Sequence, residues 1–346
     1  MPFCVSEDER QMMRLSHSTI LMALGRIAEG WEDYEARLHH QFADTTVYLI
    51  ERPQWAPGAD LKGKTLLVFG EQGLGDEILF SNTLRDALER LGPDGRLILS
   101  VEPRLVPLFA RTYPQARVEA HATYLVGGRT VRYTPALQEE LDTIDLWSPM
   151  GSLLREFRPT VETFPDRVAQ IMPDPERVAH WRRVLQDAPP GPKVGLLWKS
   201  AISKDARHRY FSPFADWAAV LKTPGVSFVN LQYGDCAAEL AQAADEFGVE
   251  IWQPPGIDLK QDLDDLAALC AAMDLIVGFA NATLNIGAAC GVPTWLIVSP
   301  GAWPMLGTTR YPWYPQVRAF IAPTLGNWGP VMAKVGEALA AHLAER

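Results

Sequence analysis

The stretch that decides the fold is TLLVFGEQGLGDEILFSNTLRDAL, residues 65–88. It opens on a short, largely apolar and β-prone run, continues through a glycine-rich turn, and then has the apolar spacing of a helix from Asp76 to Leu91. This order predicts a βα unit. A second β-prone run, RLILSV at residues 96–101, precedes another helical pattern around residues 105–111. Strands that alternate with helices predict a parallel sheet covered by helices on both faces.

The same alternation begins again after Pro173. We expect helices at residues 176–185, 214–221, 237–247 and 263–273, and strands at 193–198, 226–232, 250–252, 275–277 and 294–298. Two such series predict an α/β protein with two Rossmann-like domains. We place the first domain at residues 56–174 and the second at 175–346, with an amphipathic final helix at 331–343.

Residues 1–55 are expected to form a separate helical segment. Apolar residues recur at helix-like intervals from Ile20 to Leu38, with Gly25 and Gly30 between them. We interpret the pattern as two short helices that pack as a hairpin and are joined near Gly30. The stretch ERPQWAPGADLKGK, residues 51–64, is typical of a connector because proline and glycine punctuate it.

The composition excludes several classes of protein. A net charge of −10 argues against a nucleic-acid partner, because such binding depends on many Lys and Arg side chains. No apolar run reaches the roughly 18 residues of a membrane span, and the N-terminus is too acidic for a signal peptide. We therefore expect a cytoplasmic protein without a membrane span. Buried free thiols are expected at the four widely spaced cysteines, Cys4, Cys236, Cys270 and Cys290.

The first candidate site is the glycine-rich turn after the strand at residues 65–69. Gln72, Gly73 and Gly75 form a loop at the carboxyl end of that strand, where open α/β sheets bind ligands. Asp76 falls where the N-cap of the next helix belongs. Two interpretations stay open: Asp76 is a helix cap, or it is a general base that removes a proton from an acceptor hydroxyl.

A dehydrogenase is a further interpretation of the same turn. Gly73 and Gly75 follow a strand, and Glu102 ends the next strand, where an acidic side chain would hold a ribose. The third glycine of that fingerprint, however, falls at Ile78. A bulky side chain there opposes the close packing of helix on strand that the glycine serves.

The second candidate site follows the strand at residues 193–198. Lys199 and Ser200, with Trp198 before them, place a cation and a hydroxyl where the phosphate of a donor would be held. A basic stretch follows, with Lys204, Arg207, His208 and Arg209, which is also compatible with a solvated charged loop. Gln232 ends the next strand, where it would contact a nucleotide base or simply lie at a turn.

The third candidate site is GFANATLNIGAACGVP, residues 278–293. Small residues open a helix directly after a strand, which leaves backbone N–H groups available to an anion. Ala282, Thr283 and Asn285 would meet the phosphate or ribose of a donor, although small residues also favour close packing of helix on sheet.

Metal binding is not expected. Asp262 and Asp264 have the DxD spacing with which many sugar transferases hold a divalent cation, but they stand at the start of a helix, where acidic residues complement the dipole. The seven histidines show no metal-ligand spacing.

The blocks GEQGLGDEILFSNTLRDAL, VGLLWKS, FVNLQYGD and DLAALCAAMDLIVGFANATLNIGAACGVPTWLI, taken together, resemble the glycosyltransferase domain of bacterial tetratricopeptide-repeat glycosyltransferases. That family is related to the heptosyltransferases and, more distantly, to O-GlcNAc transferases. The segment LMALGRIAEGWEDYEARL is similar to the last helical repeat before the catalytic part. The WKS and LQYGD variants resemble flagellin glycosyltransferases, which implies a protein Ser or Thr acceptor.

The resemblance implies a role for several residues. Asp76 matches the catalytic base proposed in heptosyltransferases, Lys199 and Ser200 match the phosphate-binding turn, and Gln232 matches a block near the nucleotide. Relatives commonly have D-T-S-x-x-H where this chain has Ala280 to Asn285, so the usual histidine is replaced by Asn285.

The resemblance implies the GT-B architecture, in which the two Rossmann-like domains face a cleft. The combined expectation is an inverting, metal-independent glycosyltransferase that uses a nucleotide-sugar donor, a protein or glycan acceptor, and no cofactor. The first domain would supply acceptor and base, and the second would hold the donor. Two alternatives stay open: a non-catalytic binding or scaffold protein on the same fold, and an NAD(P)-dependent dehydrogenase.

Overall fold

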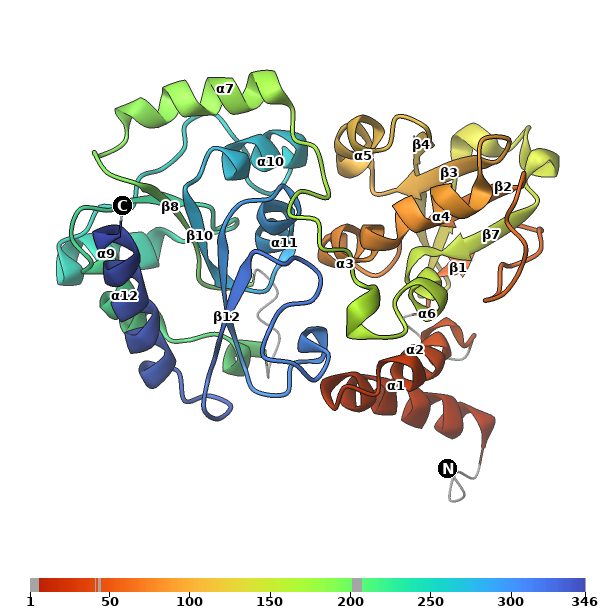
Figure 1. Ribbon diagram of the computed structural model, residues 1–346, viewed down its shortest axis with the longest axis horizontal. Helices are drawn as coiled ribbons and strands as arrows, with labels where there is room; N and C mark the ends of the chain where they lie inside the picture. The colour runs from red at the N-terminus through yellow and green to blue at the C-terminus, as the bar shows by residue number, and fades with distance from the viewer. Residues whose placement is uncertain (1–5, 41, 43–44, 201–206, 346) are drawn as a thin grey trace. The chain divides into compact units, whose positions relative to one another are not determined.

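The computed structural model describes residues 6–40, 42, 45–200 and 207–345, and the chain divides into two compact units (Figure 1). Unit 1 comprises Met1–Asp166 and Trp303–Thr308, and unit 2 comprises Arg167–Ala302 and Thr309–Arg346. The boundary therefore lies before residue 174, and a short segment late in the chain joins unit 1, which the sequence did not indicate. Each unit contains one parallel sheet.

The main sheet of unit 1 has the strand order β4 (Arg117–Ala120), β3 (Arg96–Val101), β2 (Thr65–Phe69), β7 (Leu146–Pro149), with all neighbours parallel. β2 is buried along its whole length, as its continuous apolar run predicts. The chain passes from β2 outward to β3 and β4 and then returns to β7 on the other side of β2. The direction of winding thus changes between β2 and β7.

Four α-helices accompany this sheet in unit 1, namely α3 (Leu74–Phe80), α4 (Leu84–Leu91), α5 (Val106–Thr112) and α6 (Leu154–Phe157). The single helix predicted for residues 76–91 is wrong, because a 3-10 turn, η2 (Ser81–Thr83), separates α3 from α4. The hydroxyls of Ser81 and Thr83 donate to the carbonyls of Ile78 and Phe80. Such local bonds compete with regular α-helical pairing.

A small second sheet of unit 1 was not predicted. Its order is β1 (Val47–Tyr48), β6 (Arg129–Tyr133), β5 (Ala122–Val126), with β1 parallel and β5 antiparallel to β6. The turn between β5 and β6 is Gly127-Gly128, both with positive φ, as tight hairpin turns require.

The N-terminal helical segment consists of α1 (Glu7–Ala23), α2 (Ile27–Tyr34) and a 3-10 turn. The predicted joint at Gly30 is wrong, because the two helices meet at Gly25, whose φ is 79°. Gly30 lies inside α2 at a close helix contact, where a Cβ atom would come within 2.5 Å of the Met22 side chain. Both glycines are therefore structural, but for different reasons.

The five parallel strands of unit 2 have the order β12 (Val317–Ile321), β11 (Thr294–Val298), β10 (Leu275–Phe279), β8 (Lys193–Leu197), β9 (Ser227–Asn230). The chain goes from β8 to β9 on one side and then crosses to β10 on the other, so the winding reverses between β8 and β10. The strand predicted at residues 250–252 is reduced to an isolated bridge at Trp252.

Helices cover both faces of the unit 2 sheet, as the sequence predicts for a parallel sheet (Figure 1). One face bears α8 (Ala218–Leu221), α9 (Ala237–Phe247) and α12 (Gly329–Ala344), which pack on a core that includes Trp217, Phe279 and Met332. The other face bears α7 (Pro175–Val184), α10 (Leu263–Ala271) and α11 (Ala282–Ala289). Ligands in open α/β sheets bind beyond the carboxyl ends of the strands at the reversal.

Candidate functional site

The turn that carries Asp76 lies at the reversal of winding in unit 1. It follows β2, and the residue in the left-handed region is the exposed Gln72, with φ of 61°, rather than a glycine. Gly73 is the N-cap of α3, and Asp76 is three residues inside the helix, where its Oδ2 accepts the Gly73 N–H at 3.2 Å. The prediction that Asp76 is the N-cap is therefore wrong, although its carboxylate does hold the start of α3. Gly75 lies half-buried in the first turn.

The surroundings of Asp76 change its acidity. The pKa of its carboxyl is raised from 3.8 to about 6: burial is the largest cause, the Gly73 N–H lowers the pKa in part, and the negative charges of Glu71 and Glu77 add to the rise. A general base works best when its pKa lies near the pH at which it operates, and this carboxyl is poised there.

The two neighbouring carboxylates are engaged in buried contacts. Glu71 forms a two-point ion pair with Arg37, which comes from the 3-10 turn η1 (Glu35–Leu38) after α2. Glu77 Oε2 accepts the N–H of Glu102 at 3.0 Å, and Oε1 lies 3.5 Å from His121 Nε2. Within the described part of the chain, Asp76 has no ion pair, so it is the available carboxylate of this loop.

The geometry gives the dehydrogenase interpretation no support. Ile78, at the position of the third glycine, is completely buried. Glu102, proposed as the ribose ligand, is paired with Arg104 at 2.7 Å, and its N–H is bound by Glu77.

The candidate donor residues of unit 2 come after the strands β8, β9 and β10, and the second reversal of winding lies between β8 and β10. Gln232 organises the turn after β8: its Oε1 accepts the N–H groups of Trp198 at 3.0 Å and Lys199 at 2.9 Å, and its Nε2 donates to the Tyr233 carbonyl. Gln232 is 1% exposed, so its amide serves the backbone rather than a nucleotide base. No pattern in the sequence indicated these partners.

The side chains of the turn after β8 differ in accessibility. Trp198 is buried against Phe214, with ring centroids 5.3 Å apart, and belongs to the core. Lys199 is one-third exposed, and its Nζ forms an ion pair with Glu239 of α9 at 2.5 Å. Ser200 is half-buried. Arg209 lies exposed on the 3-10 turn Arg207–Tyr210, whereas Lys204 lies outside the described residues.

The start of α11 follows β10 at the same edge of the sheet. Asn281 caps this helix by accepting the Leu284 N–H at 2.9 Å. Ala282 is half-buried, while Thr283 and Asn285 are buried. Asn285 Oδ1 accepts the Tyr311 hydroxyl at 3.1 Å, so the asparagine that replaces the usual histidine is part of the interior of unit 2. Only Asn281 and Ala282, at the very start of the helix, are half-buried; the rest of its first turn is buried.

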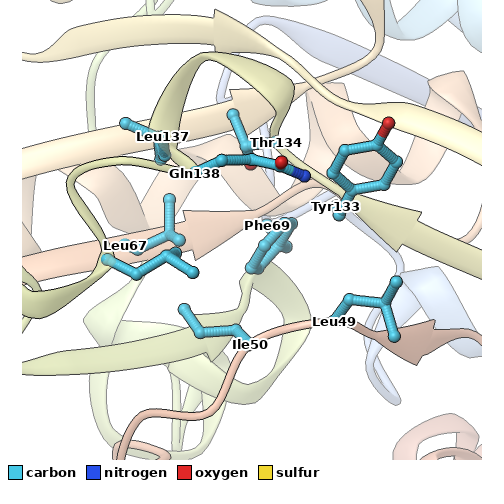
Figure 2. Close-up of a pocket in the computed structure, with 9 residues that line it drawn as sticks. Leu49, Ile50, Leu67, Phe69, Tyr133, Thr134, Leu137 and Gln138 are labelled. Atoms are coloured by element: carbon cyan, nitrogen blue, oxygen red, sulfur yellow. The ribbon is translucent and has the colours of Figure 1, made fainter.

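A separate pocket in unit 1 encloses about 90 Å³ (Figure 2). Its walls are mainly apolar, with Leu67 and Phe69 from β2 facing Leu49, Ile50 and Leu137. None of its lining residues is a candidate site residue, and the pocket offers no charged group. We therefore assign it no part in the chemistry.

Other expectations concern metals, thiols and membranes. Asp262 is the N-cap residue of α10 and accepts the Asp258 N–H at 2.9 Å. In the described ranges, no three His, Cys, Asp or Glu side chains are grouped as a metal ion would require. Cys236 and Cys270 are buried free thiols, Cys290 is half-buried, and Cys4 lies outside those ranges. No helix of the described chain is both long and apolar enough to cross a membrane.

Comparison with solved structures defines the class of fold. The E. coli ADP-heptose LPS heptosyltransferase II superposes with a TM-score of 0.57 at 14% identity, over 81% of this chain and 99% of that one. A glycosyl transferase family 9 protein from Veillonella parvula gives 0.53 at 13% identity, over 83% and 97%. The chain therefore has the GT-B glycosyltransferase fold, with parallel sheets as predicted.

At the level of sequence, the chain is similar to protein FlbA of Caulobacter vibrioides, with 52% identity over 334 residues. This alignment covers 96% of the chain but 56% of FlbA, so the chain spans little more than half of that relative's length. No family model matches the chain.

Proposed function

We propose that the protein is a glycosyltransferase that moves a sugar from a nucleotide-sugar donor to an acceptor hydroxyl by direct displacement, with inversion and without a metal ion. The observation that carries the proposal is the position of the candidate residues. Asp76 follows β2, and Lys199, Ser200 and the start of α11 follow β8 and β10. All three strands adjoin a reversal of winding, which is where this class of sheet binds ligands.

The proposed reaction assigns one step to each unit. Asp76 of unit 1 takes the proton of the acceptor hydroxyl while the acceptor oxygen forms its bond to the anomeric carbon. The bond from that carbon to the donor phosphate breaks, and the nucleotide leaves with the bonding electrons. In unit 2, Lys199, Ser200 and the first turn of α11 stabilise the negative charge that develops on the phosphate.

Lys199 needs a rearrangement for this role, because its ammonium group is paired with Glu239. The pair is one-third exposed at Lys199, and such pairs contribute little to stability. A donor phosphate, with more charge and more acceptor oxygens than one carboxylate, is expected to displace Glu239.

A nucleotide screen tests the donor assignment. Ligands that bind only the folded state raise the melting temperature, so ADP-, UDP-, GDP- and CMP-sugars can be compared directly. ADP-heptose is the first candidate, since the E. coli structural neighbour is named for it. A shift with CMP-sugars alone would instead support the resemblance to flagellin glycosyltransferases and a protein Ser or Thr acceptor.

Asp76→Asn separates binding from chemistry. The amide oxygen still accepts the Gly73 N–H but cannot take a proton, so transfer should fall by about 10²- to 10⁴-fold while the donor-induced shift persists. A rate equal to that of the wild type would refute the role of Asp76.

A second candidate function, a non-catalytic sugar-nucleotide-binding protein, is favoured by one observation. The histidine position of the relatives is occupied by Asn285, which is buried against Tyr311. Donor binding without transfer or donor hydrolysis by the wild-type protein would support this alternative. A thermal shift with NAD(H) alone would favour a dehydrogenase.

A further inference from the structure

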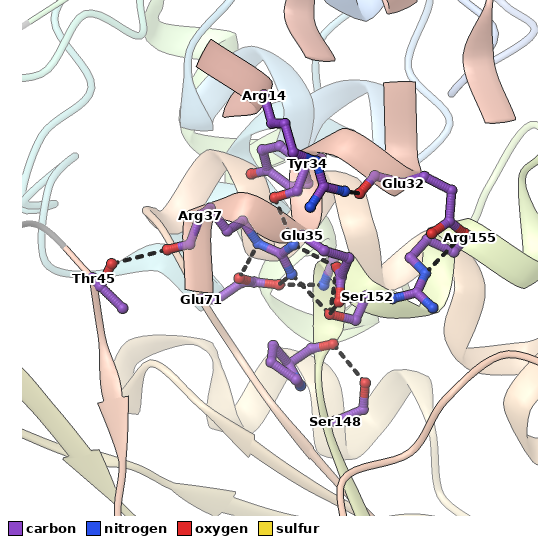
Figure 3. A network of polar contacts seen from close by, with 12 residues as sticks. Arg14, Glu32, Tyr34, Glu35, Arg37, Thr45, Glu71, Ser148, Ser152 and Arg155 are labelled. Carbon is purple, nitrogen blue, oxygen red and sulfur yellow. Dashed lines mark hydrogen bonds and ion pairs between the residues drawn. The ribbon is translucent and has the colours of Figure 1, made fainter. Parts of the chain in front are cut away.

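A buried ion pair connects the N-terminal helical segment to the loop that carries Asp76. Arg37 donates from Nε and Nη2 to the two carboxylate oxygens of Glu71, each at 2.8 Å (Figure 3). Both side chains are 2% exposed. The two parallel contacts match the planar guanidinium to the carboxylate, so the pair fixes direction as well as distance.

Both partners have further contacts that fix them in place. Glu71 also accepts the N–H of Gly151, in the turn after β7. Arg37 also donates to Glu35 at 2.7 Å and to the Ser152 hydroxyl at 3.0 Å, and its guanidinium lies 4.3 Å from the centre of the Tyr34 ring. The ion pair therefore holds together the two strand ends, β2 and β7, between which the winding reverses.

The chain leads from this pair to the candidate base in a few residues. Glu71 is followed by Gln72, which has the strained positive φ, and then by Gly73, whose N–H holds the Asp76 carboxylate. Any movement of Glu71 would be transmitted through this turn. A buried ion pair adds little stability compared with an apolar pair of similar volume, so stability alone does not account for charges at this position.

We propose that Arg37 is a positioning residue for the transfer reaction, acting through Glu71 to fix the turn that aims the Asp76 carboxylate. This inference rests on the proposed function of Asp76. It makes the helical segment part of the catalytic unit rather than an appendage of it, because the side chain that orders the loop comes from residue 37.

The charges around Asp76 give the inference a measurable signature. Glu71 from the loop and Glu77 from α3 both raise the pKa of Asp76. From the helical segment, Tyr34 and the positively charged Arg37 face the same loop. Arg37 also pairs with Glu35, which in turn pairs with Arg155 of α6. His121 Nε2 lies 3.5 Å from Glu77 Oε1, and Arg132 donates to the Gly70 carbonyl, so both side chains lie beside the same loop.

Two substitutions separate geometry from charge. Arg37→Lys keeps the positive charge but loses the two-point contact, so kcat should fall roughly 10- to 100-fold while the acidic limb of the pH profile stays in place. Glu71→Gln removes the negative charge and leaves Arg37 paired with Glu35, so the pKa of Asp76 should fall and the acidic limb should move about one unit to lower pH.

Arg155→Lys is the matched control. Arg155 belongs to the same network and pairs with Glu35 at 3.0 Å, but it does not contact Glu71. Its substitution should leave kcat and the pH profile unchanged. Equal losses of kcat in Arg155→Lys and Arg37→Lys would overturn the inference. A folded Arg37→Lys protein with the kcat of the wild type would also overturn it, and so would a Glu71→Gln protein whose acidic limb of the pH profile has not moved.

A second measurement needs no substrate. The Asp76 carboxyl resonance, identified by its absence in Asp76→Asn, can be titrated by NMR in the wild type and in Glu71→Gln. A lower pKa in Glu71→Gln supports the inference, and an unchanged pKa refutes it. Absence of transfer by the wild-type protein would instead count against the proposed function, so the two failures are distinguishable.

Discussion

Asp76→Asn should make the protein more stable at neutral pH while it removes the base. In the folded protein the Asp76 carboxyl has a pKa of about 6, whereas an aspartate in the unfolded chain has the ordinary value of 3.8. Between these two values the folded state holds a proton that the unfolded state has released. The contribution of the Asp76 carboxyl to the free energy of unfolding is therefore largest below pH 4 and is lost as the pH rises through 6.

The size of the effect follows from the shift. A difference of about two pKa units corresponds to roughly 3 kcal/mol, as an upper limit for a half-buried group. An amide has no charge to lose, and its oxygen retains the Gly73 N–H contact. The free energy of unfolding of Asp76→Asn should thus equal that of the wild type near pH 4 and exceed it by up to about 3 kcal/mol at pH 7.5.

Urea denaturation at several pH values between 4 and 8 measures this difference. Groups that do not interact with Asp76 titrate equally in both proteins and cancel. Asp94→Asn, at an exposed position before β3, is the matched control, and its difference from the wild type should not vary across the range. The reasoning would be refuted if the difference in free energy of unfolding between Asp76→Asn and the wild type did not change with pH, or if the wild type were the more stable at pH 7.5. Either result would show that the N-terminus of α3 stabilises the charged carboxylate.

Three further substitutions, one of them with a matched control at Glu239, test unit 2. Lys199→Met should weaken donor binding at least about tenfold by calorimetry, since a charge-assisted contact contributes roughly 1.5 to 3 kcal/mol, whereas Glu239→Gln should not weaken it. Unchanged affinity would remove Lys199 from the site. Gln232→Leu leaves two N–H groups unpaired and should lower the free energy of unfolding by roughly 1 to 3 kcal/mol; a neutral effect would mean that water replaces the amide. Gly278→Ala places a Cβ 2.5 Å from the Leu197 carbonyl oxygen and should cost about 1 to 3 kcal/mol, unless an unchanged melting temperature shows that the strands can separate.

The strands of the two main sheets were the most predictable part of the fold. A buried strand such as β2 is apolar along its length, and this pattern depends only on neighbouring residues. The break between α3 and α4 was missed because the apolar spacing continues through it, while the hydroxyls of Ser81 and Thr83 close local turns. The hairpin β5–β6 was missed because β5 is exposed and lacks a buried face.

The loops that carry the candidate residues were predictable, but the contacts of those residues were not. The glycine-rich turn and the loop after β8 could be located because they follow recognisable strands. The partners of Glu71 and Gln232 could not, since Arg37 is 34 residues from Glu71 and Trp198 is 34 residues from Gln232 along the chain. No local pattern marks such pairs, and only the three-dimensional fold brings them together.

The segment Trp303–Thr308 has a consequence for how the protein is synthesised. It belongs to unit 1 although unit 2 surrounds it in sequence, and Trp303 packs edge-on to Trp31 with ring centroids 6.1 Å apart. At Gly307 a Cβ would come within 2.5 Å of the Gly25 backbone. Unit 1 therefore remains incomplete on the ribosome until residue 308 emerges, roughly 10 to 30 seconds after its main sheet has left the exit tunnel. Unit 1 can consequently complete its packing only after most of unit 2 has been synthesised. A nascent chain that stops before residue 303 would expose the surface around Trp31 and Gly25 to chaperones and proteases.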